Sequence, residues 1–104
     1  MSSSKILLAF DGNRARVKIE GEGTFENAMM FKSAARDLVS KGAKEFVFDL
    51  HECTKLDSTF LGTILIVALE AKETEGRIQV QGANPEIKAL FRGVGLDRFT
   101  GPSS

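Results

Sequence analysis

Apolar positions along the chain follow two different periods, which predict alternating strands and helices. Two short apolar runs, residues 6–10 and 15–19, flank the turn signal D-G-N and are predicted to pair as a hairpin. Residues 25–41 are predicted to form a helix that buries one face and stops at a glycine. The apolar positions that define this face recur at helical spacing and are Ala28, Phe31, Ala35 and Leu38.

The second half of the chain repeats a strand and helix pattern. Residues 45–50 are apolar at both odd and even positions, apart from their two acids. This pattern favours a strand that is covered on both faces. A helix over about residues 58–75 and an alternating strand from Ile78 follow. Asn84 is predicted to cap a last helix that has Pro85 in its first turn. Its apolar stripe consists of Ile87, Leu90, Phe91 and Val94.

The predicted order of elements is therefore β-β-α-β-α-β-α. Strand, crossover helix and further strand occur twice, and such connections are right-handed and parallel. The pattern predicts an α/β fold with a mostly parallel β-sheet, an N-terminal edge hairpin and packed helices. A chain of 104 residues is the size of one domain, so residues 1–104 are expected to form a single unit with flexible ends at 1–4 and 101–104.

Charge and composition exclude several classes of function. The chain has 14 basic and 14 acidic residues, and no cluster of lysines and arginines predicts a nucleic-acid or lipid surface. One cysteine, Cys53, and one histidine, His51, cannot supply an internal disulfide or a complete zinc site. We expect no cofactor and no bound metal. No run resembles a signal peptide or a membrane span, so the protein is expected to be cytoplasmic.

Motifs of enzyme chemistry are missing from the sequence. It contains no phosphate-binding loop, no dinucleotide fingerprint and no nucleophile elbow. His51, Cys53 and Asp57 lie close in sequence, but alternate positions on a connecting segment give no mutual geometry for a nucleophile and its base. The protein is therefore predicted not to be an enzyme.

An acid and two hydroxyls, Asp57, Ser58 and Thr59, stand where the polar stretch after residue 50 becomes an apolar helix. Asp57 or Ser58 could cap that helix, a contribution of about 1 kcal/mol. Capping accounts for one oxygen-bearing side chain rather than three in a row. A phosphate on Ser58 would be favoured by the helix dipole and repelled by the neighbouring Asp57. From the chemistry of the residues alone, capping is the simpler explanation.

A longer pattern changes this interpretation. FVFDL, six further residues, then D-S-T-F-L-G-T and a late G-L-D-R-F resemble the STAS family, in particular its single-domain anti-sigma factor antagonists. The resemblance implies that Ser58 is the phosphoacceptor of a serine kinase that is also the anti-sigma factor. It further implies partner switching, in which the unphosphorylated form binds the kinase and the phosphorylated form is released. The residues expected to meet the partner are Asp57, Thr59, Phe60, Leu61 and Gly62.

The sequence departs from the family pattern at two positions near this motif. Phe60 replaces the usual glycine, and Thr24 stands where many members have an acid, with Glu22 the nearest one. The helix from residue 58 is apolar nearly all round, so part of it has no core to enter. We predict that Leu61, Leu65 and Ala68 face the sheet, with Ile64 beside them. Phe60 is predicted to be exposed as a partner anchor, on a line with Thr63 and Val67, of which Val67 is expected to be covered by neighbouring helices.

Two interpretations from different classes remain at this point. The first is a regulatory protein that binds an anti-sigma factor/serine-protein kinase and is restored by a phosphatase. The second is a constitutive scaffold or subunit of a signalling or transport complex, in which Ser58 only caps a helix; a small enzyme or ligand-binding domain is a weaker third. In each case we expect no nucleic-acid or membrane partner, and a monomer or weak dimer.

Overall fold

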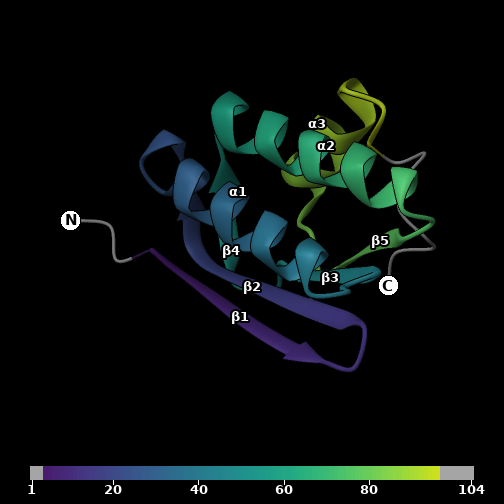
Figure 1. Cartoon of the computed structure of the whole chain (residues 1–104). Coiled ribbons are helices and arrows are strands. Elements are labelled where there is room, and N and C mark those ends of the chain that lie inside the picture. Colours follow the sequence, from purple (N-terminus) through teal and green to yellow (C-terminus); the bar gives the residue numbers. More distant parts are fainter. Residues whose placement is uncertain (1–3, 97–104) are drawn as a thin grey trace.

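The computed structural model describes residues 4–96, which form one sheet and three helices (Figure 1). The observed order confirms the predicted one, with one additional short strand. The elements are β1 (Lys5–Asp11), β2 (Arg14–Gly23), α1 (Phe25–Ser40), β3 (Glu45–Asp49), β4 (Cys53–Leu56), α2 (Ser58–Glu73), β5 (Arg77–Gln81) and α3 (Pro85–Gly93).

The sheet has the order β1-β2-β3-β5, and β4 pairs with the far end of β2. β1 and β2 form the predicted antiparallel hairpin, whereas β3, β4 and β5 join by parallel pairing. Gly12 has a φ of 66° at the first loop position of the hairpin, a conformation that glycine adopts without strain. The sheet is therefore mixed, with its antiparallel part confined to the N-terminal edge.

β4 was not predicted from the sequence, and β2 extends beyond the predicted residues 15–19. Gly21 and Gly23 suggest an end to the strand, but a register shift between Gly21 and Glu22 lets β2 bend and continue. The first part of β2 pairs with β3, and its last residues pair with β4. This bend brings the end of β2 beside the start of α2.

α1 and α2 lie next to each other on one face of the sheet (Figure 1). Alternate residues of the strands point to this face and form the buried core with Phe31 of α1 and Ile64 of α2. The core-facing strand residues are Ala15, Val17, Ile19, Phe46, Phe48, Ile78 and Val80. The other face of β2 is charged, and Arg14 and Lys18 there form ion pairs with Glu45 and Glu52.

Candidate functional site

The start of α2 is held to the start of α1 by a single carboxylate. Asp57 precedes α2 in extended conformation, and its Oδ1 accepts a hydrogen bond of 2.8 Å from the Phe60 backbone N–H. Its Oδ2 accepts a second bond of 2.8 Å from the backbone N–H of Phe25, the first residue of α1. Because unpaired N–H groups at a helix start need acceptors, one side chain caps two helices. The two helix starts are thereby fixed side by side.

Ser58 is the first residue of α2, and its side chain is exposed beside this double cap. Within residues 4–96 its hydroxyl has no hydrogen-bond partner, so Asp57 and not Ser58 caps the helix. The interpretation of Ser58 as a capping residue is therefore wrong. Thr59 is also exposed, and its backbone carbonyl accepts a bond of 2.9 Å from the Thr63 hydroxyl. Both predicted hydroxyls thus face solvent at the helix start.

The prediction that Phe60 is exposed is wrong. Its exposed fraction is 0%, and its ring stacks on Phe31 of α1 with centroids 5.1 Å apart. On another side a Cβ added at Gly23 would lie only 3.0 Å from the ring, so the end of β2 packs tightly against it. Phe60 lies in the first turn of α2, but α1 and the bent end of β2 cover that turn. It is a core residue of the domain.

The rest of the predicted surface line on α2 is buried as well. Val67 is 1% exposed, as expected from coverage by neighbouring helices, whereas Thr63, at 7% exposed, does not point away from the core as predicted. Leu61 is buried as predicted for a sheet-facing residue, whereas Leu65 is only half-buried. The sheet and α1 both contact α2, so its apolar surface is enclosed over more than the predicted stripe. Gly62 is half-buried, and nothing lies within 4 Å of a Cβ built on it.

Exposed apolar side chains at this end of the molecule come from α1. Phe25 is 67% exposed, Met29 is 69% exposed and Met30 is 59% exposed, all within the first two turns. Sequence reasoning missed them because it followed the buried stripe through Ala28 and Phe31. The signal was present, since apolar residues outside that stripe have no core to enter. The N–H of Phe25 bonds to Asp57, so this apolar turn stands next to Ser58.

Further along the two helices, Arg36 of α1 pairs with Glu70 of α2 through bonds as short as 2.8 Å. Hydrogen bonding to the Arg36 guanidinium lowers the pKa of the Glu70 carboxyl from its ordinary value. A shallow depression of about 200 Å³ lies on this side of α1. Its lining residues are Met29, Lys32, Ser33 and Arg36. The helices are therefore tied at two places, by Asp57 at their start and by this ion pair beyond their middle.

His51 and Cys53 do not form a reactive pair. The His51 ring is exposed, and its Nδ1 lies 2.8 Å from Asp49 Oδ1. Partial burial raises the pKa of the Asp49 carboxyl, but hydrogen bonds from His51 and the charge of Arg16 outweigh this and lower it overall. Cys53 is buried, and burial raises the pKa of its thiol, which disfavours the nucleophilic thiolate.

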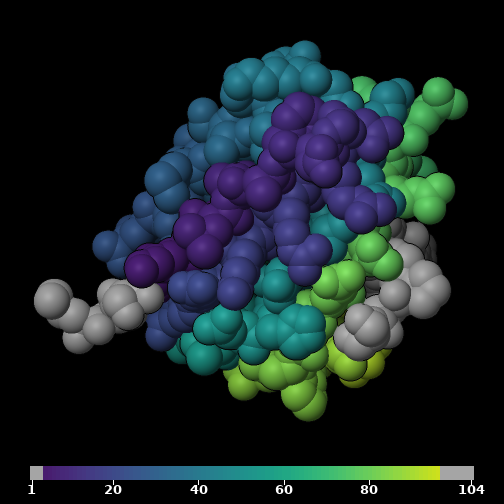
Figure 2. Space-filling model, turned by 90° about the horizontal axis from the view of Figure 1, so that it is seen from below, coloured from purple at the N-terminus to yellow at the C-terminus, as the bar shows by residue number. Residues whose placement is uncertain are grey.

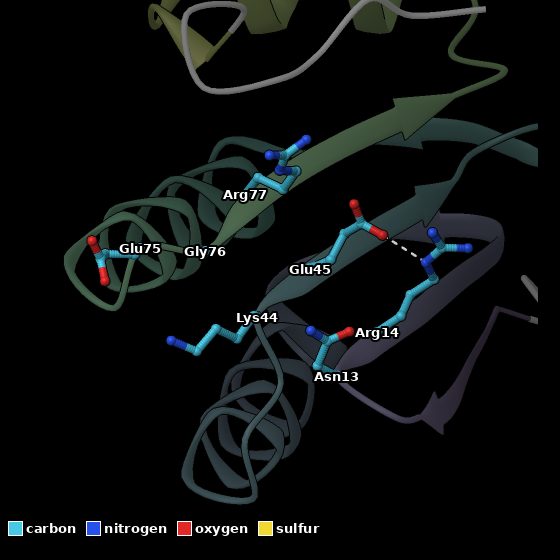
Figure 3. A pocket seen from close by; sticks show the side chains of 7 residues that line it. All are labelled: Asn13, Arg14, Lys44, Glu45, Glu75, Gly76 and Arg77. Carbon is cyan, nitrogen blue, oxygen red and sulfur yellow. Dashed lines mark hydrogen bonds and ion pairs between the residues drawn. The ribbon is translucent and has the colours of Figure 1, made fainter.

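A polar depression of about 400 Å³ lies at the other end of α2 (Figure 3). The residues around it are Asn13, Arg14, Lys44, Glu45, Glu75, Gly76 and Arg77. The Arg14 guanidinium forms an ion pair with the Glu45 carboxylate at 2.6 Å, and Lys44 Nζ donates a hydrogen bond to the Thr74 carbonyl at 3.1 Å. Figure 3 shows Lys44 and Glu75 extending outward rather than toward a common point. The polar side chains around this depression do not point to a common centre, so the site at Asp57 and Ser58 is the better candidate for a functional site.

Residues 4–96 contain no group of three or more His, Cys, Asp or Glu side chains that could hold a metal ion. Within the same residues, no helix has both the length and the apolar character needed to cross a membrane.

Comparisons with known proteins agree with this fold. The family model described as "Mlab, STAS domain" matches residues 6–101. A STAS-domain containing protein of Pseudomonas aeruginosa (strain UCBPP-PA14) is 27% identical over 81 residues, which cover 78% of this chain and 79% of that protein.

Two solved structures have the same fold at low sequence identity. SpoIIAA, a Bacillus cell fate determinant in its phosphorylated form, has a TM-score of 0.81 and 16% identity, covering 96% of this chain and 91% of its own. An anti-sigma factor antagonist from Mycobacterium paratuberculosis has a TM-score of 0.79 and 21% identity, covering 97% and 85%.

Proposed function

This chain belongs to the STAS domain family, and from that premise we propose that it is a regulatory binding protein of the anti-sigma factor antagonist type. In its unphosphorylated form it binds an anti-sigma factor that is also a serine kinase. Phosphorylation of Ser58 releases this partner, and a phosphatase restores binding. The observation that carries the proposal is an exposed serine hydroxyl with no partner among residues 4–96, at a helix start that another residue already caps.

The surroundings of Ser58 support a switch based on charge. A phosphate would add about −1.5 to −2 charges directly beside Asp57, whose two oxygens are both held by backbone N–H groups. Asp57 therefore cannot turn away from the new charge without releasing a helix start. Glu26, in the first turn of α1, adds a further acid to this end of the domain. A partner that desolvates this surface would meet strong like-charge repulsion after phosphorylation.

Phosphorylation of Ser58 is not expected to change the fold. The Ser58 side chain packs against nothing that a phosphate would displace, since it is exposed, and negative charge at a helix start is favourable. Kinase binding is therefore expected to weaken by about 1 to 3 kcal/mol while the domain stays folded.

The partner surface combines the exposed hydroxyls with the apolar turn of α1. Phe25 and Met29 provide contact area next to Ser58, and exposed aromatic side chains are frequent anchors of protein interfaces. Gly62 lies half-buried at the next turn of α2, where a partner backbone could come close. Leu61 is only 5% exposed and supports this surface from below rather than contacting the partner broadly.

The phosphoacceptor is tested with a cognate kinase of the histidine-kinase-like ATPase class from the same genome. Incubation with ATP should add one phosphate, which fragment mass spectra place on Ser58. Ser58→Ala should abolish the modification, whereas Thr59→Ala should retain it. Modification that persists in Ser58→Ala and disappears in Thr59→Ala would show that the acceptor is Thr59.

Binding of the same kinase separates the switch from a constitutive scaffold. Ser58→Asp should weaken binding relative to the wild type in a calorimetric titration. Gly62→Glu should also weaken it with little cost to the fold, because nothing lies within 4 Å of a Cβ built at this position. Gly93→Glu on α3 is the matched control, since its Cβ position is equally open. Equal affinity of the wild type and Ser58→Asp would favour the scaffold.

A further inference from the structure

No other strand of residues 4–96 pairs with the outer edge of β1. Within residues 4–96, β1 pairs with β2 alone, so its other edge carries unpaired backbone groups. The strand is nevertheless apolar: Leu7 is 49% exposed, and Leu8 and Phe10 are each 39% exposed. In Figure 2 the purple atoms of β1 lie open on the surface. Long, exposed, apolar edge strands are templates for pairing with another strand.

The hairpin determines which backbone groups of β1 face outward. Gly12 and Asn13 form a two-residue loop, so the flanking pair of Asp11 and Arg14 is a hydrogen-bonded pair of the antiparallel ladder. The register runs without a bulge from there to Lys5. The backbone groups that bond to β2 therefore belong to every second residue from Asp11 toward the N-terminus. The backbone groups that point outward belong to Ile6, Leu8 and Phe10.

The outward residues and the ends of β1 are complementary to a second copy of the same strand. In an antiparallel pair centred on Leu8, each Leu8 lies opposite the other, and Ile6 lies opposite Phe10. These side chains share the face of the sheet on which β2 presents its core residues. At the two ends, Lys5 lies opposite Asp11. Neither Lys5 nor Asp11 forms an ion pair with another residue of 4–96.

We propose that β1 is a self-association surface, through which two copies of this chain pair antiparallel about Leu8 into a continuous sheet. The pairing satisfies the outward backbone groups, covers the exposed apolar side chains and neutralises both charged ends by symmetry. β1 lies at the far side of α1 from α2 (Figure 1), so both copies keep Ser58 accessible. The proposal does not depend on whether Ser58 is phosphorylated.

The test is sedimentation velocity of the full chain at low salt over a range of concentrations. The wild type should show a concentration-dependent monomer and dimer equilibrium. Lys5→Asp and Asp11→Lys should each weaken dimerisation about 10-fold, because each places like charges at both ends of the paired strands. An equimolar mixture of the two variants should dimerise as the wild type does, since their strands carry opposite charges at both ends.

The double variant Lys5→Asp/Asp11→Lys separates pairing between copies from stability within one copy. Inside each chain, Lys5 lies opposite Glu20 and Asp11 lies opposite Arg14, so both substitutions worsen the intrachain pairs. Between copies, the double variant restores opposite charges. Recovery of dimerisation despite a lower melting temperature would therefore support the proposal.

A central substitution tests the apolar part of the same surface. Leu8→Asp places two like charges side by side and should abolish the dimer, with thermal unfolding as the check of the fold. Leu90→Asp on α3 is the control, since Leu90 is 36% exposed and lies on another element. A wild type that stays monomeric up to about 1 mM would overturn the proposal. So would a dimer that is insensitive to both charge variants.

Discussion

The first turns of α1 and α2 lie side by side but are built in opposite ways. The first turn of α1 starts with Phe25, which is 67% exposed, whereas the first turn of α2 contains Phe60, which is 0% exposed. The exposed residues in the first turn of α2 are polar instead, because Ser58 and Thr59 face solvent. One carboxylate, Asp57, joins the two turns through bonds of 2.8 Å to each.

The difference separates two tasks that sequence reasoning had placed on one helix. α2 carries the hydroxyls on a start that is fixed by its buried ring, and α1 carries the apolar side chains that could contact a partner. In the proposed function, a charge change on α2 would thus act on a contact made largely by α1 without repacking the core. Substitutions at four positions test this division.

Phe60→Ala should have the largest effect. Removing a fully buried ring that stacks on Phe31 leaves a cavity in the core and should lower the free energy of unfolding by about 3 to 5 kcal/mol. Chemical denaturation measures this directly. Phe25→Ala is the matched control, because it removes the same side chain from an exposed position and should change stability by about 0.5 kcal/mol or less. Similar losses for both variants would contradict the division.

Asp57→Ala should have the next largest effect on stability. It leaves the N–H groups of Phe25 and Phe60 without their acceptor and should cost about 2 to 3 kcal/mol. The control is Asn84→Ala, which removes one bond of 2.8 Å from the start of α3 and should cost about 1 kcal/mol. If the two variants unfold at the same denaturant concentration, Asp57 does not act on both helices.

Phe25→Ala should act on binding rather than on stability. The exposed ring beside Ser58 is expected to contribute about 1 to 3 kcal/mol to the affinity for the kinase. Calorimetric titration of the folded variant measures this contribution. Leu69→Ala is a suitable control, because Leu69 is 45% exposed but lies near the other end of α2. An unchanged affinity for Phe25→Ala would place the partner contact elsewhere.

Much of the fold could be predicted because its signals are local. Apolar periodicity marks the hairpin and the helices, and Asn84 caps α3 as predicted, accepting from the Ile87 N–H at 2.8 Å. β4 could not be predicted, since four residues with Cys53 and Leu56 buried at their ends show no alternation. Its pairing depends on the bend of β2 near Gly21, which is a tertiary feature.

At the candidate site, the sequence indicated the helix cap but not the burial of the residues around it. Asp57 fits a helix cap from its sequence position, but its second bond, to Phe25 more than 30 residues away in sequence, depends on how the two helices pack. For the same reason Phe60 was misjudged. The first turn of a helix is usually exposed to solvent, but here Phe31 and the end of β2 pack against the Phe60 ring and bury it. The family departure at Phe60 therefore changes the core rather than the docking surface.

The smallest effect is expected at Ser58 itself, in the stability of the unmodified domain. Its hydroxyl has no hydrogen-bond partner among residues 4–96, so Ser58→Ala should change the free energy of unfolding by about 0.5 kcal/mol or less. Ser58→Asp should also change it by about 0.5 kcal/mol or less, because the favourable effect of an acid at a helix start is opposed by repulsion from Asp57. Both electrostatic effects should shrink as salt screens the charges. Denaturation of both variants at two ionic strengths measures these changes. A loss near 1 kcal/mol in Ser58→Ala would mean that Ser58 shares the capping of α2 with Asp57, and the exposed hydroxyl would then serve the fold as well as the switch.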